Sequence, residues 1–133
     1  MQTLLRQMGI LVFIGIVGGV NAFADETVVK QILDDPNLFS HEEVQAIREM
    51  SKQLAQAQAS TIVSTSVKDG PSLDVVEQKY GKSDSTIDSM PLPPQNRPLT
   101  IHWYGNLGLA VPQEDAKRPI VALFVEGPKE LPK

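Results

Sequence analysis

The sequence predicts a two-layer α+β domain, with two or three helices packed on an antiparallel sheet of three or four strands. Three features support this prediction. Apolar residues recur every three or four positions across residues 41–57, as on one face of a helix. Apolar and polar residues alternate across residues 99–111 around a Gly-Asn turn, as in a β-hairpin. The apolar run at residues 119–125 is typical of a strand that is covered on both faces.

The first 24 residues have the three parts of a secretory signal peptide. Arg6 gives a positive start, an apolar run spans residues 9–20, and Ala22 and Ala24 place small residues where signal peptidase reads. The run is shorter than the roughly 20 apolar residues of a membrane-spanning helix and is interrupted by glycines. We therefore expect cleavage after Ala24 and a periplasmic protein, rather than an uncleaved membrane anchor.

The composition of the remaining chain limits its partners. Removing 24 of the 133 residues leaves 109, enough for one small domain, with 11 basic and 16 acidic residues and a net charge of −5. Its lysines are scattered, which argues against a nucleic-acid partner and against attachment to an anionic membrane surface. The chain has no cysteine, so disulfides, a thiol nucleophile, cysteine metal ligands and a lipid anchor at the processing site are excluded.

The expected order is a short helix with a linker over residues 25–40, the α+β domain over 41–126 and a flexible tail over 127–133. The short helix is predicted because apolar residues at 28, 29, 32 and 33 share one helical face. It should end before Pro36.

The helix predicted over residues 41–57 has a well-marked start. Ser40 is expected to cap it, and Glu43, three residues later, completes a capping box. Phe39 before the cap and Val44 in the first turn form a hydrophobic staple. The helix should therefore begin at His41.

The next segment is less regular. Residues 60–67 are rich in β-branched side chains, so they form either a strand, which we favour, or a frayed continuation of the helix. A third helix is predicted over residues 73–80, with Ser72 as its cap. Gly81 is expected in the left-handed conformation that commonly ends a helix.

Prolines at 91, 93, 94 and 98 dominate the segment at residues 90–98. Two interpretations are open: a stiff loop between strands, which is the commoner use of such segments, or a Pro-x-x-Pro recognition motif. A strand is expected near Ile87. Further strands are predicted on both sides of the Gly105-Asn106 turn and at residues 119–125.

The sequence shows no catalytic grouping, so we expect a protein that is not an enzyme and has no cofactor or metal. Trp103 is in phase with Leu99 and Ile101 and should be buried. His102 then lies on the opposite, exposed side, and Tyr104 is exposed beside the turn. Exposed tyrosines often anchor protein interfaces. Tyr104, Asn106 and His102 are therefore the candidate protein-binding residues.

Two other functions remain open. A small-ligand or metal-binding protein would use His102 with nearby acids. A small hydrolase would need His102 to contact a serine and an acid in the fold. The sequence leaves the oligomeric state open.

Several segments within residues 70–125 match the pattern of a known family. They are Gly70 and Ser72 at a helix start, Val76, "KYGKSD", and the strand segments "WYGNLGLAV" and "IVALFV". With these segments the chain resembles the SmpA/OmlA-type outer-membrane-assembly proteins and the β-lactamase inhibitor proteins that share their small helix-plus-sheet fold. The resemblance implies two helices on an antiparallel sheet and a partner among envelope proteins. The assembly members carry a lipid-modified cysteine after the signal and proline at the position of Ser83, and this chain has neither.

Overall fold

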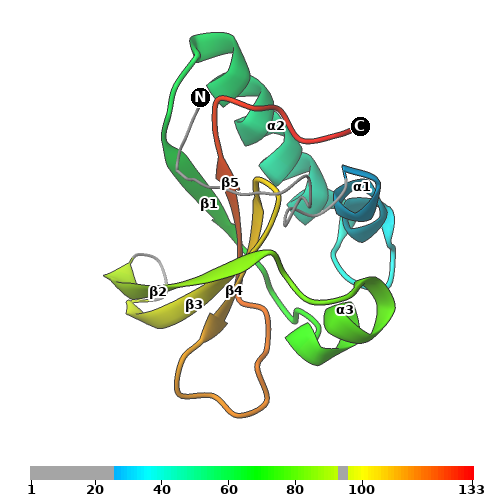
Figure 1. The fold of residues 1–133 in the computed structure, drawn as a ribbon, viewed down its shortest axis with the longest axis vertical. Helices are drawn as coiled ribbons and strands as arrows, with labels where there is room; N and C mark the ends of the chain where they lie inside the picture. Colours follow the sequence, from blue (N-terminus) through cyan, green and yellow to red (C-terminus); the bar gives the residue numbers. More distant parts are fainter. Residues whose placement is uncertain (1–25, 93–95) are drawn as a thin grey trace, which may run out of the picture.

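The computed structural model of the chain describes residues 26–92 and 96–133, which form three helices and one five-stranded antiparallel sheet (Figure 1). The predicted α+β class is confirmed. The sheet has five strands because the segments near residues 62 and 87 both join it. The predicted signal peptide at residues 1–24 lies outside the described residues.

The helices begin and end close to the predicted residues. They are α1, Glu26–Asp34; α2, His41–Ala57; and α3, Leu73–Tyr80. The predicted capping box of α2 is present. The Ser40 hydroxyl accepts the Glu43 backbone N–H at 3.1 Å, and the Glu43 carboxylate accepts the Ser40 N–H at 3.1 Å. The second carboxylate oxygen of Glu43 accepts the Lys68 N–H at 2.7 Å, which ties the start of α2 to the chain after the first strand.

The start of α3 is capped as predicted, but its end differs in detail. The Ser72 hydroxyl accepts the Asp74 N–H at 3.2 Å and donates to the Lys117 carbonyl at 3.0 Å. Gly81 has a positive φ of 90°, but its ψ of 177° is not that of the left-handed helix. Only glycine occupies this backbone region readily. Gly81 therefore turns the chain directly into an extended strand.

The strands are β1, Ile62–Ser66; β2, Ser85–Leu92; β3, Arg97–Tyr104; β4, Leu107–Pro112; and β5, Ala122–Glu126, in the spatial order β1-β5-β4-β3-β2. The predicted hairpin turn at Gly105-Asn106 joins β3 to β4, with Tyr104 opposite Leu107. β5 lies between β1 and β4, which explains why the apolar run at residues 119–125 has no polar face.

The proline-rich segment is part of a hairpin. β2 extends through Pro91 to Leu92, and β3 begins at Arg97, so strands occupy much of the segment. The pairing shifts between Ser89 and Leu92, where a bulge or irregularity interrupts the ladder. A proline is tolerated there because β2 is an edge strand. Residues 93–95 lie outside the described residues, and the choice between a loop and a Pro-x-x-Pro recognition motif stays open.

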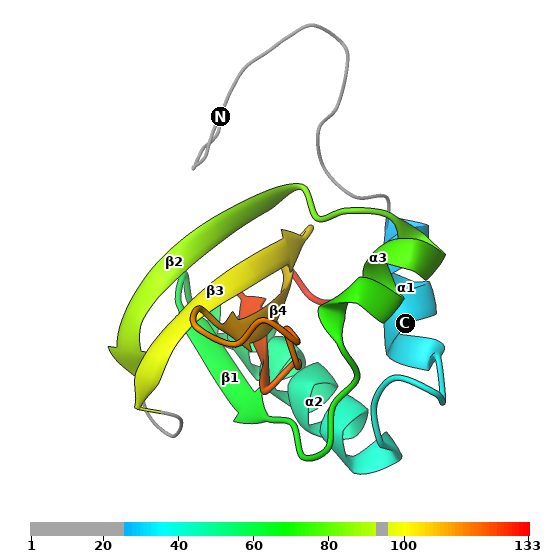
Figure 2. The same ribbon diagram turned by 90° about the horizontal axis from the view of Figure 1, so that it is seen from below.

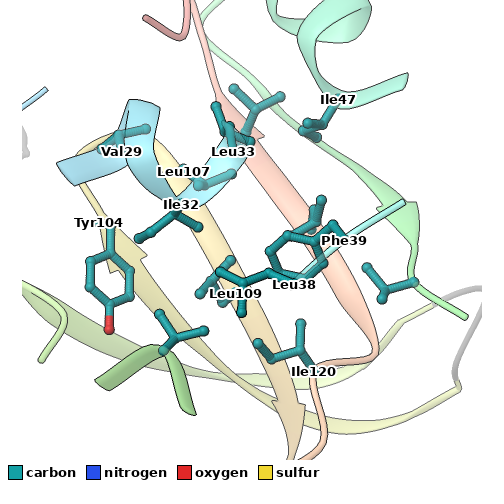
Figure 3. Packing of buried hydrophobic residues seen from close by; sticks show 14 of the residues in the cluster. Val29, Ile32, Leu33, Leu38, Phe39, Ile47, Tyr104, Leu107, Leu109 and Ile120 are labelled. Carbon is teal, nitrogen blue, oxygen red and sulfur yellow. The ribbon is translucent and has the colours of Figure 1, made fainter. Parts of the chain in front are cut away.

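All three helices lie on one side of the sheet (Figures 1 and 2). Their apolar side chains meet those of β4 and β5 in the main hydrophobic cluster (Figure 3). Leu107, Leu109 and Leu123 form the sheet side of this cluster, and Ile32 and Ile47 are among its helix residues. The 41–57 and 73–80 helices therefore cover one face of the sheet, as predicted.

The C-terminal segment is docked, whereas the sequence predicted a flexible tail over residues 127–133. Leu131 is buried in the main cluster, and its N–H donates to the buried Ser51 hydroxyl at 2.7 Å. Arg48 donates to the Pro132 carbonyl at 2.7 Å. The prolines indicated a loose end, but one apolar side chain and a polar group on α2 hold the segment in place.

The backbone of Gly81 gives a first test. A Cβ at this position would meet no atom within 4 Å, so Gly81→Ala changes only the backbone strain. We expect a loss of about 1–3 kcal/mol in the free energy of unfolding, measured by urea denaturation. Lys82→Ala at the adjacent exposed position should change it by less than about 0.5 kcal/mol. Equal midpoints for Gly81→Ala and the wild type would contradict this account of how α3 ends.

The docked tail gives a second test. Ser51→Ala leaves the buried N–H of Leu131 without its acceptor, which should cost about 1–3 kcal/mol. Hydrogen exchange at the Leu131 amide should become faster, which distinguishes a released tail from general destabilisation. Ser60→Ala, at an exposed serine, is the control. Slow exchange at Leu131 in Ser51→Ala would show that the hydroxyl does not hold the tail.

Candidate functional site

A second apolar cluster lies on the side of the sheet that faces away from the helices. It comprises Leu99, Ile101, Trp103, Ala110, Ala122 and Phe124, and it includes no helix residue. Directly paired residues of antiparallel strands point to the same side, so the register defines this side of the whole sheet. We call it the helix-free face. Its sixteen positions are Ile62, Ser64, Ser66, Ser85, Ile87, Ser89, Arg97, Leu99, Ile101, Trp103, Gly108, Ala110, Pro112, Ala122, Phe124 and Glu126.

The centre of the helix-free face is built around a glycine. Trp103 lies directly opposite Gly108 in the β3–β4 ladder. A Cβ on Gly108 would lie 2.7 Å from the Ile101 side chain and 3.1 Å from the Trp103 ring. The missing side chain therefore makes room for the indole against the sheet. Trp103 is buried as predicted, but it lies on the helix-free face and not beneath the helices.

Large apolar side chains are exposed at both edges of this face. Ile87 on β2 is 53% exposed, and Ile62 on β1 is 46% exposed. Glu126, near Ile62, and Arg97, at the start of β3, are the two charged residues among the sixteen positions. The cluster between the edges is itself buried, since each of its six residues is at most 7% exposed, so the large apolar side chains that remain accessible lie at the two edges of the face. Exposed apolar side chains that border a polar rim often mark interaction sites. The helix-free face is thus the candidate functional site.

Tyr104, predicted to be exposed, is buried. Only 1% of its surface is accessible, and its hydroxyl donates to the Gly81 carbonyl at 2.8 Å. Burial, together with the nearby carboxylates of Glu77 and Asp84, raises the pKa of Tyr104 to about 12. The prediction was wrong because strand alternation turns Tyr104 toward the helices, where the main cluster covers it. Alternation alone could not show which side of β3 is covered.

Asn106, also predicted to bind a partner, is used within the fold. Its side-chain amide donates to the Lys129 carbonyl at 2.7 Å and to the Glu126 carbonyl at 3.4 Å. The turn that carries it therefore helps to hold the C-terminal segment. The hairpin tip is committed to internal contacts and is no longer the best candidate for a binding surface.

His102 was expected on an exposed face, but it is only 8% exposed. It points to the helix side of β3, next to the α3 end of the sheet. Burial lowers the pKa of His102, and the charge of Arg118 lowers it further, while Glu77 and Asp88 act in the opposite direction. The imidazole is therefore neutral at pH 7. Within the described ranges, no hydrogen bond joins it to the serine and the acid that a hydrolase would need.

The metal-binding alternative finds no ligand set in the described part of the chain. Across residues 26–92 and 96–133, no group of three or more His, Cys, Asp or Glu side chains is placed to hold a metal ion. His41 is exposed at the start of α2.

In the same described residues, no helix combines the length and the apolar character needed to cross a membrane.

A depression of about 360 Å³ lies between the α1–α2 linker and the first half of α2. Its charged or titratable lining residues are Asp34, Asp35, His41 and Arg48. The Arg48 guanidinium donates to the Asp34 carboxylate at 3.0 Å and to the Pro132 carbonyl at 2.7 Å. Its charge is therefore already used to join α1, α2 and the tail.

Asp35, which also lines this depression, accepts the hydrogen bonds of a partly buried polar network. Its carboxylate accepts hydrogen bonds from the Lys79 ammonium at 2.6 Å, the Tyr80 hydroxyl at 2.8 Å and the Asn37 N–H at 2.9 Å. These donors, with Lys79 the strongest, lower the pKa of Asp35 to about 2. The network joins the chain after α1 to the end of α3. Lys79 is thus an ion-pair partner, which the sequence did not indicate.

No protein-family model matches the chain, and no match is found among curated proteins or solved structures. The resemblance to the SmpA/OmlA-type proteins therefore stays a prediction.

The Asp35 network makes stability depend on pH. The folded pKa of about 2 lies below the unfolded value of 3.8, so the unfolded chain binds this proton more readily. The stabilisation is complete above about pH 4 and is lost as the pH falls toward 2. Asp35→Asn should be less stable than the wild type at pH 7, and the difference should shrink as the pH falls through this window.

Urea denaturation of both proteins between pH 7 and pH 2 measures this difference. Tyr80→Phe removes one of the three donors to Asp35 and should give an intermediate curve. A gap between wild type and Asp35→Asn that stays constant from pH 7 to pH 2 would contradict the proposed role of the Asp35 carboxylate.

Proposed function

We propose that this is an exported envelope protein, not an enzyme, that binds another protein through the helix-free face of its sheet. The observation that carries the proposal is the second apolar cluster, which has no helix over it and continues into exposed Ile62 and Ile87 at the sheet edges. A sheet with apolar residues on both faces normally has both faces covered. Within the described residues, helices cover one face only; the cluster on the other face is buried without them, and Ile62 and Ile87 remain exposed at its edges.

The chemistry of the face defines the partner. Fourteen of the sixteen positions are apolar or carry a small hydroxyl or no side chain, and the two charged residues, Glu126 and Arg97, lie at the margins of the face. A charged partner side chain placed against the exposed Ile87 would lose its water without gaining a counter-charge. The expected partner therefore presents apolar and uncharged side chains to the face. Charged groups belong at its rim.

The overall charge supports a protein partner. The acidic balance disfavours a nucleic acid, because a net negative charge opposes binding to phosphates. The signal-like N-terminus and the resemblance to the SmpA/OmlA-type proteins support a partner in the envelope. The hairpin residues have no part in the proposal, because Tyr104 and Asn106 are held inside the fold.

New charges on the face provide the test. Ile62→Lys and Ser64→Lys each place a cation on the helix-free face at the β1 edge, where the side chain can still reach water when the protein is free. We expect both variants to fold and to lose the envelope protein that the wild type enriches after crosslinking and purification. Gln53→Lys, on the exposed side of α2, is the matched control and should retain the partner.

Two outcomes would contradict the proposal. One is a set of captured proteins that is identical for wild type, Ile62→Lys and Ser64→Lys, which would place the binding surface elsewhere. The other is recovery of only abundant background proteins with every variant. Circular dichroism and thermal unfolding of each variant establish that a lost partner reflects the surface and not an unfolded protein.

A further inference from the structure

Strand β2 has an open edge. Among the described residues, β2 is the last strand of the sheet and pairs with β3 alone. Residues 85–88 of this strand are exposed, and β2 runs along the outer margin of the sheet (Figure 2). An exposed edge strand presents unpaired backbone N–H and carbonyl groups that another strand can bind. Pro91 and the irregular pairing after Ser89 protect only the far end of β2.

The register shows which backbone groups of β2 face outward. The Trp103 carbonyl accepts the Asp84 N–H at 2.8 Å, so Trp103 directs its backbone toward β2. By alternation Ile101 and Leu99 do the same, and their partners Ser85, Ile87 and Ser89 face β3. The backbone groups of Thr86 and Asp88, between them, are directed to the open edge.

The exposed part of β2 is self-complementary when it is read in opposite directions. Its sequence is Ser85-Thr86-Ile87-Asp88-Ser89. If a second copy pairs antiparallel with Ile87 on the two-fold axis, serine faces serine, threonine faces aspartate and isoleucine faces isoleucine. A hydroxyl then lies opposite the Asp88 carboxylate, and no two like charges meet. The apolar pair lies on the helix-free face.

We propose that two copies of this chain associate through β2, antiparallel and with Ile87 on the two-fold axis. The outward-facing backbone groups of Thr86 and Asp88 match this register. They form the hydrogen-bonded pairs between the copies, and Ile87 forms the non-hydrogen-bonded pair. Both copies contribute the same residues, so the contact is isologous and produces a closed dimer, not a longer chain of copies. It joins the two helix-free faces into one continuous surface, although the contact itself needs no other partner.

The opposite edge of the sheet lacks this symmetry. β1 reads Ile62-Val63-Ser64-Thr65-Ser66, so antiparallel pairing about its centre would place exposed Ile62 opposite a serine. Exposure at the two edges is similar, with Ile62 46% and Ile87 53% exposed. The β1 edge is therefore a matched control for an experiment on β2.

The absence of cysteine allows a direct test by disulfide trapping in the protein without its signal segment. Residues in a non-hydrogen-bonded antiparallel pair have Cα atoms about 4.5 Å apart, within the roughly 4.4–6.8 Å range of disulfides. Under mild oxidation Ile87→Cys should convert mostly to a covalent dimer on a non-reducing gel. Ile62→Cys, at the same protein concentration, should remain mostly monomeric.

The register has its own test. In the proposed pairing, residue 85 of one copy faces residue 89 of the other. Each single variant, Ser85→Cys or Ser89→Cys, therefore places its thiol opposite a serine. The double variant places thiols opposite one another and should trap the dimer much faster than either single variant. Sedimentation of the unsubstituted protein should show dimer that increases with concentration. Ile87→Lys should shift it toward monomer, because it brings two cations together.

Crosslinking of Ile87→Cys no faster than that of Ile62→Cys would overturn the proposal. Equal trapping of Ser85→Cys and the double variant would overturn the stated register. If self-pairing fails while Ile62→Lys and Ser64→Lys still lose the envelope partner, only this inference falls. If the dimer forms but no partner depends on the face, only the proposed function falls.

Discussion

The structure depends on one constraint, the burial of β5 on both of its faces. This strand lies between β1 and β4, with Leu123 and Val125 directed to the helices and Ala122 and Phe124 directed away from them. An all-apolar strand in this place requires apolar neighbours on both sides of the sheet. On the helix side these neighbours are Leu107 and Leu109 of β4. On the other side they are Ala110 and the paired residues Trp103 and Gly108. Helices cover only one side; on the other side the apolar cluster is buried without a helix, and Ile62 and Ile87 stay exposed at the edges of that face.

Polar contacts hold the helical layer in a fixed position on the sheet. The Asp35 network joins the α1–α2 linker to α3, and Arg118 pairs with Asp74 and Glu77 to join the chain before β5 to the same helix. The hydroxyl of Ser51 fastens the C-terminal segment to α2. Each contact connects segments that are far apart in sequence, and in the Asp35 network the buried carboxylate has three donors. Buried polar groups satisfied in this way favour one arrangement of the layers.

Local sequence signals predicted most of the fold. The capping box at Ser40 and Glu43, the Ser72 cap and the Gly105-Asn106 turn act over a few residues, so their consequences could be read directly from the chain. The candidate site was predicted less well. Tyr104 and His102 were taken as exposed because alternation divides a strand into two sides without showing which side the helices cover. The tail was taken as loose because the acceptor for Leu131 lies eighty residues away, on α2.

The sequence alone determined the α+β class, the helix starts, the central hairpin and the doubly apolar character of residues 119–125, since each follows from periodicity or from the conformational preference of a few neighbouring residues. Only the tertiary structure decided which sheet face the helices occupy, that Asp35 pairs with Lys79, and that β1 and β2 are the outermost strands among the described residues. These properties arise from contacts between segments distant in sequence, where burial and charge depend on what the fold brings together. The helix-free face belongs to this second group, although every side chain that forms it can be read in the sequence.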